Sequence, residues 1–586
     1  MSNPLLVLWY RIFLPHERSA QRHEHPRGVT PDGSQPTDTV FLVLRRMRAP
    51  LIVLITIFSV SVLGLTLVPG QDPSGQPWRM SLFDAFYFMS CTASTIGFGE
   101  FPYPLSTPQR MWVTLSIYLA VIGWAYAIGS LLALLQESGF RQALARRRVA
   151  RQVARLQEPF LLVAGYGQTG HLVGRALDDV GRRLVVVDID PLRIDTLDVE
   201  SYRADVPGLI GDAAVPDILV TAGLRHPRCV GVLALTNDDE ANLAVTLTAS
   251  LLRPDLPVIA RTGSAAAGRQ LTMLNPDTWV VNPFDRVGNE LCLSLRKPAA
   301  YQLTQWLTSP PGSAVPPRLP TTPPGRWVVM GDGRFAAEVS ADLRTDGLEV
   351  TQVATDVIAP DLLIDAVGFV AGSDRDSPNI LAIEAARKAY PTLTVAARQC
   401  DPANRALYHA MGVDRVLVLA EVAAREVIAR AVSPALWRVV SAVPIEDDSL
   451  AEQMLGRLVT RCGSRVPEVW SVCLDSDEAP TLDEWLATGT ARLGDLLRDP
   501  TNRDRSLPVV PVLLHHGTDH RVGPDEKQVI VPGDTLVLAG RSEARRALDT
   551  TLHDPATRAY VVDGSMVPTT WLGRRLQQAA GGRSGT

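Results

Sequence analysis

Hydrophobic residues are concentrated near the N-terminus in two long stretches without a charge. The first covers residues 49–68 and the second covers residues 111–136. At a rise of about 1.5 Å per residue, roughly 20 apolar residues cross a bilayer core of about 30 Å, so each stretch predicts a membrane-spanning helix. Arginines precede the first stretch and follow the second. The positive-inside rule therefore predicts a multi-pass protein of the inner (plasma) membrane with both termini in the cytoplasm.

The segment between the two spans has the pattern of a re-entrant loop. Residues 69–77 are rich in Gly and Pro and predict an exposed turret, and Ser81 can cap a short apolar helix over residues 82–93. The sequence continues Thr95-Ile96-Gly97-Phe98-Gly99-Glu100. Non-helical backbone is tolerated at membrane depth only where it lines a water-filled path, and alternating glycines let successive carbonyls face one axis. Taken alone, the hexapeptide could also be an ordinary Gly-rich loop.

The order of span, pore helix, TIGFG and span resembles the two-span potassium channels, whose filter consensus is TVGYG. The resemblance implies a selectivity filter with K⁺ as the permeant ion, bound by carbonyl oxygens and a hydroxyl that replace its hydration shell. These filter residues are Thr95, Ile96, Gly97, Phe98 and Gly99, and the first four would hold K⁺. Phe98 lacks the hydroxyl of the consensus Tyr, which bears on the strictness of K⁺/Na⁺ selectivity.

Two further positions of the pore follow from the same resemblance. Glu100 stands where the consensus has Asp and would place a ring of carboxylates at the outer mouth. Gly123 in the second span resembles the inner-helix hinge glycine of the family, and close helix packing is the alternative role. Because one filter strand cannot surround an ion, we expect a homotetramer.

After a basic linker, short buried-type strands alternate with amphipathic helices, which predicts an α/β fold with a parallel sheet. A strand over residues 160–164 precedes a Gly-x-Gly-x-x-Gly motif and a helix, and the next strand ends at Asp188. This is the context that a dinucleotide-binding motif requires, with the pyrophosphate at the helix N-terminus and the carboxylate on a ribose diol. We expect the motif residues to hold NAD(H), with ATP or ADP as competitors: Gly165, Tyr166, Gly167, Gln168, Thr169 and Gly170.

The strand–helix units that follow resemble the nucleotide-binding domain called RCK (regulator of K⁺ conductance) over about residues 159–296. The resemblance implies that further residues line the nucleotide cleft: Asp212, Ala213, Thr236, Asn237 and Asp238. Calcium-gated members of the family carry an acidic pair where this chain has Arg261 and Gly263. We therefore expect that calcium site to be missing. Whether Ca²⁺ or another divalent effector binds elsewhere in the chain is an open question.

A second, shortened copy of this domain follows a Pro-rich linker. Residues 373–379 repeat residues 236–242 at an offset of 137, whereas Gly331 follows Gly165 at an offset of 166. The difference of 29 residues removes the third strand–helix unit. Because Asp332 repels a pyrophosphate, we expect the second copy to be mainly structural, with Arg334 as the residue through which it could hold a ligand of its own. The histidines over residues 515–520 predict a hairpin loop rather than a metal site.

The fold class is therefore a membrane α-helical pore followed by tandem cytoplasmic α/β Rossmann-like RCK domains and a small α+β C-lobe. The mean hydropathy of +0.08 averages these unlike parts. Six scattered cysteines without a CxxC motif suit a reducing compartment, and a net charge of −5 makes a nucleic acid partner unexpected. We expect the following segments: N-terminal tail 1–40, pore domain 41–137, basic linker 138–158, first RCK lobe 159–300, Pro-rich linker 301–324, second lobe 325–441, C-lobe 442–555 and tail 556–586.

The function expected from these parts is a ligand-gated potassium channel rather than an enzyme. Four subunits would form one pore, and eight RCK lobes would form a gating ring that nucleotide binding shifts between two shapes. A membrane-tethered NAD-dependent oxidoreductase is one alternative, but no catalytic constellation accompanies the nucleotide motif. A nucleotide-sensing subunit that regulates a cation transporter and does not conduct is the other.

Overall fold

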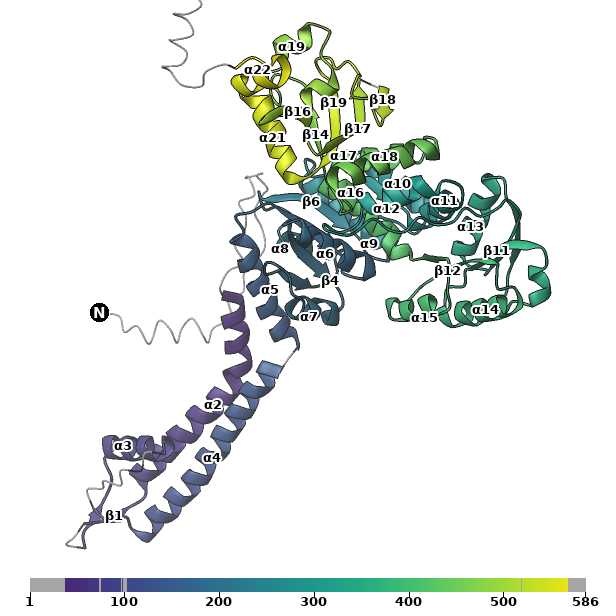
Figure 1. Cartoon of the computed structure of the whole chain (residues 1–586). Coiled ribbons are helices and arrows are strands. Elements are labelled where there is room, and N and C mark those ends of the chain that lie inside the picture. Colours follow the sequence, from purple (N-terminus) through teal and green to yellow (C-terminus); the bar gives the residue numbers. More distant parts are fainter. Residues whose placement is uncertain are drawn as a thin grey trace, which may run out of the picture. The chain divides into compact units, whose positions relative to one another are not determined.

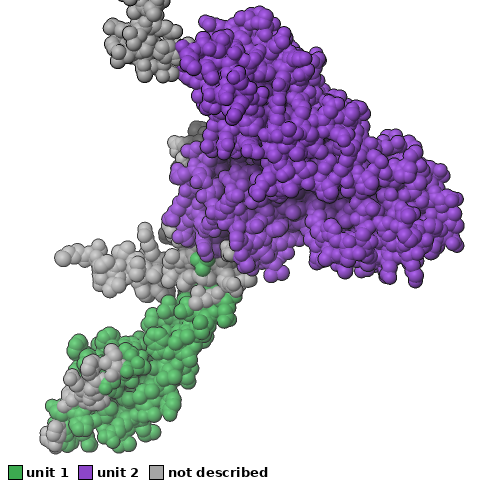
Figure 2. Space-filling view, in the orientation of Figure 1, with its two compact units in different colours: residues 1–144 green, residues 145–586 purple. Residues whose placement is uncertain are grey.

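The computed structural model describes residues 37–566 apart from residues 73–74, 96, 98–102, 137 and 518. The chain divides into two compact units, residues 1–144 and residues 145–586 (Figure 2). Two long apolar helices dominate the first unit, and parallel α/β sheets with an antiparallel C-terminal lobe make up the second (Figure 1). The predicted fold class is therefore confirmed.

The long helices of the first unit are α2 (Thr37–Leu67) and α4 (Thr107–Gln136). Each contains a stretch that is long and apolar enough to cross a membrane, Met47–Leu67 in α2 and Thr107–Leu134 in α4. These stretches coincide with the predicted spans, although α2 begins earlier and runs through Pro50. Few of their side chains are buried within this unit, as helices that face lipid or other subunits require.

A short helix, α3 (Leu82–Ala93), follows the turret between the long helices and has the predicted bounds. Its predicted cap is also present, since Ser81 Oγ accepts a hydrogen bond of 3.1 Å from the backbone N–H of Asp84. The turret contains a two-stranded pairing of β1 (Gly70–Gln71) with β2 (Pro77–Trp78). A small apolar core joins these elements to the helices: Val62, Leu65, Met80, Ala85, Met89 and Val113.

The first lobe of the second unit is built on a six-stranded parallel sheet with the order β5-β4-β3-β6-β7-β8. The strands are β3 (Phe160–Ala164), β4 (Arg183–Asp188), β5 (Gly208–Ile210), β6 (Cys229–Ala234), β7 (Val258–Arg261) and β8 (Trp279–Val281). The helices between them are α6 (Gln168–Asp179), α7 (Pro191–Val199), α8 (Pro216–Thr221), α9 (Asp239–Leu252) and α10 (Ala265–Leu274). The strand order reverses between β3 and β6, which is where doubly wound folds bind ligands.

The second lobe repeats this plan with five parallel strands in the order β10-β9-β11-β12-β13. The strands are β9 (Arg326–Met330), β10 (Glu349–Val353), β11 (Ala366–Ala371), β12 (Thr394–Arg398) and β13 (Arg415–Leu417). Its helices are α13 (Arg334–Thr345), α14 (Asp376–Ala389) and α15 (Arg405–Ala410), with short 3-10 turns at Pro360–Leu363 and Pro402–Asn404. Within these described residues no strand corresponds to β5, so the predicted loss of one strand–helix unit is confirmed.

Each sheet is followed by a helix pair, and these pairs join the two lobes. The pairs are α11 (Pro283–Arg296) with α12 (Pro298–Leu307), and α16 (Leu419–Val432) with α17 (Pro434–Ala442). α16 packs back on α6 of the first lobe, and α11 packs on α13 of the second lobe. Each lobe therefore packs against the first helix of the pair that follows the other lobe's sheet.

The C-lobe has a four-stranded antiparallel sheet with the order β14-β19-β17-β18. Its elements include α18 (Asp448–Cys462), β14 (Glu468–Cys473), β17 (Val509–His516), β18 (Asp519–Val522), β19 (Thr535–Gly540), α21 (Ser542–His553) and α22 (Pro555–Asp563). α12 shares a core with α17, α18 and this sheet, so the segment expected as a linker from residue 301 begins as a packed helix. The segment expected as a loose tail from residue 556 likewise begins with α22, in which Val561 and Val562 are buried.

Candidate nucleotide site and pore segment

The glycine-rich loop runs from β3 to α6 at the switch point of the first sheet. Gly165 has a φ of +98°, and a Cβ at this position would lie 2.7 Å from the backbone nitrogen of Thr236, which follows β6. A Cβ on Gly170 would lie 2.0 Å from the carbonyl oxygen of Gly165. Both positions therefore require glycine, because the turn brings the ends of β3, α6 and β6 into contact.

The N-terminus of α6 offers backbone N–H groups to an anion. Gly167 is its N-cap residue and supplies no side-chain acceptor, so the first amides of the helix have no capping partner. The guanidinium of Arg193 on α7 stands beside this loop, 3.4 Å from where a Cβ of Gly167 would be. Uncapped amides and a guanidinium are groups that bind phosphates in proteins. Arg193 was not among the residues predicted from the sequence. Its position five residues after Asp188, on the helix that follows β4, was the pattern that could have placed it near the cleft.

Asp188 lies at the predicted place at the tip of β4, but it already has several partners. Its Oδ2 accepts a hydrogen bond of 2.5 Å from the N–H of Tyr166, and its Oδ1 accepts one of 2.8 Å from the N–H of Asp190. Arg193 Nη1 lies 3.4 Å from Oδ2, and the side chain of Asp188 is only 3% exposed. Because a carboxylate has about four acceptor positions, capacity for a ribose hydroxyl is left, but its first role is to fix the loop and Arg193.

The side chain of Tyr166 is turned away from the nucleotide cleft into the core. It is buried against α6, and its hydroxyl lies within hydrogen-bond distance of Tyr202 and Glu200. Burial raises the pKa of Tyr166 well above its usual range, and the hydrogen bond to Tyr202 adds to this. Of the predicted motif residues, Tyr166 therefore contributes its backbone alone.

The other predicted residues gather at the same edge of the sheet. The N–H of Gly211 donates to the carbonyl of Asp188, which places Asp212 and Ala213 beside the tip of β4. Asp212 Oδ1 accepts from the N–H of Ala214 at 2.9 Å, and Asp238 caps α9 through the N–H of Glu240 at 2.9 Å. Both acids therefore shape turns at the rim of the cleft.

Thr236 and Asn237 belong to a braced turn that both lobes share. Asn242 Oδ1 accepts from the N–H of Thr236 at 3.1 Å, and its Nδ2 donates to the carbonyl of Arg261 at 2.8 Å. In the second lobe, Asn379 makes the same bonds to Ser373 and Arg398, at 2.9 and 3.0 Å. The repeat at an offset of 137 therefore reflects a shared turn geometry rather than a shared ligand.

The two glycine loops differ in the charge placed over them. In the second lobe, a carboxylate oxygen of Asp374 stands 2.9 Å from where a Cβ of Gly333 would be. The corresponding residue of the first lobe is Asn237, which is neutral. Arg334 is engaged elsewhere, because it lies 3.5 Å from Asp285, 3.4 Å from Glu338 and 4.6 Å from the ring centre of Phe284. These contacts favour the structural interpretation of the second lobe.

The first glycine loop also touches the second lobe. Gln168 Nε2 donates a hydrogen bond of 3.1 Å to the backbone carbonyl of Cys400, which follows β12. The two residues lie 232 positions apart in the sequence, so no local pattern could predict the contact. A residue of the glycine loop is therefore in direct contact with the neighbouring lobe.

Metal-binding groups are scarce in the part of the chain that the structure describes. No set of three or more His, Cys, Asp or Glu side chains there could hold a metal ion. The histidines expected in a hairpin pair across β17 and β18, with His515 opposite His520, which confirms the hairpin. Arg261 occupies one of the two positions where a calcium-binding acid was expected to be missing. Its guanidinium donates a hydrogen bond of 3.2 Å to the backbone carbonyl of Thr236.

Two of the predicted filter residues are described, and both adopt the left-handed conformation. Thr95 has a φ of +61° and Gly97 a φ of +66°, and such angles are uncommon for a residue with a Cβ. Ile96, Phe98, Gly99 and Glu100 lie outside the described residues. The pore helix is tied to this segment, since the N–H of Gly97 donates to the carbonyl of Cys91 at 3.3 Å.

Gly123 lies in the middle of α4, which continues through it as an unbroken helix. A Cβ at Gly123 would lie 3.0 Å from Ile57 Cδ1 and 3.1 Å from Leu54 Cδ2 on α2. The small residue thus permits close approach of the two spans, which favours the packing role. Its role as a gating hinge stays a prediction.

Comparisons with known proteins agree with this division of the chain. Residues 51–137 match the family described as Ion channel, and residues 161–283 match the TrkA-N domain. Potassium channel protein 1 of Methanocaldococcus jannaschii is 27% identical over 223 residues, covering 37% of this chain and 60% of that protein. The KefC potassium-efflux protein of Cronobacter sakazakii is 32% identical over 131 residues, covering 22% of this chain and 19% of that protein.

The chain thus spans 60% or less of the length of these curated relatives, which are channel and efflux proteins rather than enzymes. Among solved structures, the GsuK channel bound to NAD is similar at 15% identity with a TM-score of 0.40, covering 88% of this chain and 99% of that one. GsuK bound to ADP is similar at 17% identity with a TM-score of 0.36, covering 67% of this chain and all of that one. The chain thus combines a segment that matches the ion-channel family with a TrkA-N domain, and it is similar to potassium channel proteins over part of its length.

Proposed function

We propose that the chain is one subunit of a potassium channel whose opening is controlled by an adenine nucleotide. NAD(H) is the first candidate, and ATP and ADP are the competitors. The observation that carries the proposal is that one chain contains two features. The first is a pore helix followed by Thr95 and Gly97 in the left-handed conformation, and the second is a glycine loop that leads into an uncapped helix N-terminus beside Arg193. The first feature suits ion passage and the second suits a phosphate.

In the proposed assembly, four copies surround one ion path, and their eight α/β lobes form a cytoplasmic ring. α5 (Ser138–Ala154) follows α4 along the chain, and its residues Val149 and Val153 are buried in the core of the first lobe. A change in the lobe therefore has a covalent route to the inner helix. Lobes that sample two arrangements would open or close the pore when a nucleotide favours one of them.

Each residue of the cleft has a distinct part in nucleotide binding. The amides at the start of α6 would receive the phosphates, and Arg193 would neutralise part of their charge. Asp188 would hold the loop and offer its remaining acceptor positions to a ribose diol, which disfavours a ligand with a 2′-phosphate. Gln168 would transmit the change, because it already bonds the carbonyl of Cys400 in the second lobe.

Ion conduction is tested by flux from liposomes that contain the full chain. We expect K⁺ to pass in preference to Na⁺ and the variant Gly97→Ala to conduct poorly, because Ala resists a φ of +66°. The matched control is Gly129→Ala in α4, where a Cβ would meet no atom within 4 Å. Equal passage of K⁺ and Na⁺ would refute the selectivity, and nucleotide binding without any flux would favour the regulatory-subunit alternative.

Nucleotide control is tested by the mass of ligand retained after purification, and by titration of the ligand-free chain with NAD(H), ADP and ATP. Arg193→Gln should weaken binding at least tenfold and shift the nucleotide dependence of flux. Arg183→Gln is the control, because Arg183 lies at the opposite end of β4 and is paired with Glu158 at 2.5 Å. Identical affinities in the two variants would contradict the assigned site.

A further inference from the structure

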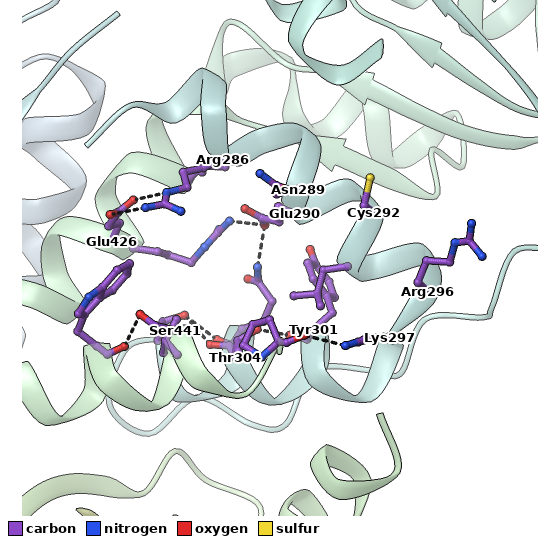
Figure 3. A pocket seen from close by; sticks show the side chains of 18 of the residues that line it. Arg286, Asn289, Glu290, Cys292, Arg296, Lys297, Tyr301, Thr304, Glu426 and Ser441 are labelled. Carbon is purple, nitrogen blue, oxygen red and sulfur yellow. Dashed lines mark hydrogen bonds and ion pairs between the residues drawn. The ribbon is translucent and has the colours of Figure 1, made fainter. Parts of the chain in front are cut away.

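A second cleft lies where the helix pairs of the two lobes meet, away from the glycine loop. It has a volume of about 730 Å³, within the range of about 300–1,000 Å³ that is typical of ligand sites (Figure 3). Its walls come from α11, α12, α16 and α17, each of which contributes residues three or four positions apart. Side chains from both lobes therefore line one continuous cavity.

Two ion pairs cross the cleft and join the lobes. Arg286 of α11 lies 3.2 Å from Glu426 of α16, and Arg425 of α16 is paired with Glu290 of α11. Figure 3 shows both carboxylates among the lining side chains. Glu426 is also paired with Arg430 at 2.7 Å, so two guanidinium groups share one carboxylate.

Positive charge is in excess around the cavity and is the more accessible charge. Four cationic side chains line the cavity against three carboxylates, which leaves one positive charge uncompensated. The cations are Arg286, Arg296, Lys297 and Arg425, and the acids are Glu290, Glu426 and Asp346. The side chain of Arg286 is 50% exposed and that of Arg296 43%, whereas that of Glu426 is 5% exposed. An incoming ligand therefore meets guanidinium groups first.

Two of these guanidinium groups have donors to spare. Arg286 uses Nε and Nη2 on Glu426, and Arg296 uses Nε and Nη2 on Asp346. Neither Nη1 group donates to any residue that the structure describes. The two arginines stand ten positions apart on α11, so their Cα atoms lie about 15 Å apart along the helix axis. The rings of Tyr301 on α12 and Trp437 on α17 add flat apolar surface to the cavity from the two helix pairs.

We propose that this cleft binds an elongated organic anion with a phosphate or carboxylate group at each end, one held by Arg286 and the other by Arg296. Carboxylate and phosphate groups both present two oxygens to the guanidinium fork, and the existing ion pairs can stay in place because the free N–H groups suffice. Both anchoring arginines belong to α11 of the first lobe, whereas Arg425 and Trp437 line the cleft from α16 and α17 of the second, so a ligand that fills the cleft contacts both lobes. The cleft is thus a second regulatory site, and its binding property does not depend on the proposed ion conduction.

The test is calorimetric titration of the detergent-solubilised full chain at constant ionic strength. The probes are two series of matched length, linear α,ω-dicarboxylates from succinate to sebacate and the corresponding linear α,ω-alkane bisphosphonates. We expect the longest members to bind at least tenfold more tightly than the shortest, with acetate and orthophosphate inactive. Whichever series is favoured identifies the end group as carboxylate or phosphate. Absence of binding by both series, or affinity independent of length, would overturn the proposal.

Substitutions of cleft residues test whether the probe binds in this cleft. Arg286→Gln and Arg296→Gln should each lower the affinity for the longest probe at least tenfold and remove the dependence on length. Arg545→Gln is the matched control, because Arg545 is 46% exposed and paired with Glu468 in the C-lobe. Ser441→Trp narrows the cleft without removing a charge and should also abolish binding. Unchanged affinity in the cleft variants, or loss of binding in Arg193→Gln, would show that the anion binds elsewhere.

Discussion

The contact between α11 and α13 makes a sharp test of how the two lobes are joined. Asp342 on α13 faces Gly288 on α11, and its Oδ2 is buried without a hydrogen-bond partner. The corresponding helices α6 and α16 carry Ala176 and Ala424 at these positions, by the offsets of 166 and 136 that align the helices. We expect the variant Gly288→Ala to be destabilised and the double variant with Asp342→Ala to recover.

The expected magnitudes follow from the distances. A Cβ on Gly288 would lie 2.2 Å from Oδ2 of Asp342 and 2.7 Å from its Cβ, so the helices must separate. Overpacking of this kind costs about 1–3 kcal/mol, and the better helix propensity of Ala returns about 1 kcal/mol. The single variant should therefore lose up to about 2 kcal/mol of local stability, the difference between these two effects. Asp342→Ala removes the 2.2 Å clash with Oδ2 and a buried carboxylate oxygen without a hydrogen-bond partner but keeps the Cβ of residue 342, so the double variant should recover most of the lost stability.

Hydrogen exchange of peptides from α11 and α13 in the full chain measures this local stability. The coupling free energy of the double-variant cycle should be about 2 kcal/mol. Ala424→Gly is the control, because it should cost about 1 kcal/mol in α16 without coupling to Asp342. If Gly288→Ala exchanges like the parent chain, or if Asp342→Ala fails to rescue it, the proposed packing of these helices is wrong.

Three further predictions follow from the same structure. Burial, with help from the Glu338 carboxylate, raises the pKa of Asp342 to about 6, so the stability of its contact should be present at low pH and be lost as pH rises through about 6. Hydrogen exchange at pH 5.5 and 7.5 checks this, and Asp342→Asn should remove the difference. Gly170→Ala should lower nucleotide affinity at least tenfold in titration, since its Cβ would clash with the carbonyl of Gly165. Asn237→Asp, which copies Asp374 of the second lobe, should weaken nucleotide binding about tenfold through charge repulsion and leave the melting temperature near that of the parent.

Local pattern was enough to predict most elements. The helix at Leu82–Ala93 follows from an N-cap serine and an apolar run, and the strand Phe160–Ala164 follows from a continuous apolar segment before glycine. The missing unit of the second lobe followed from comparing two repeat offsets. These features are set by residues close in sequence, where capping, periodicity and glycine conformations act.

Contacts between distant segments escaped the sequence analysis. α12 packs into the C-lobe core, although a Pro-rich stretch directly after it suggested a linker. Arg193 was missed because arginines are common on helix surfaces, and only the fold brings it beside Gly167. The same holds for the pairs across the second cleft, such as Arg286 with Glu426, which lie 140 positions apart. Such pairs depend on how two helix surfaces meet, and no local pattern carries that information.

The two lobes keep the same turn and differ in what it faces, which indicates a division of roles. The asparagine brace, with Asn242 in one lobe and Asn379 in the other, keeps its three bonds to the backbone. The charge above the glycine loop is not kept, because Asn237 corresponds to Asp374. The arginine of the second loop, Arg334, pairs with α11 of the first lobe instead of facing a ligand. Because its loop arginine is used in the interface between the lobes, the second lobe has the contacts expected of a structural partner, and that role stays a prediction.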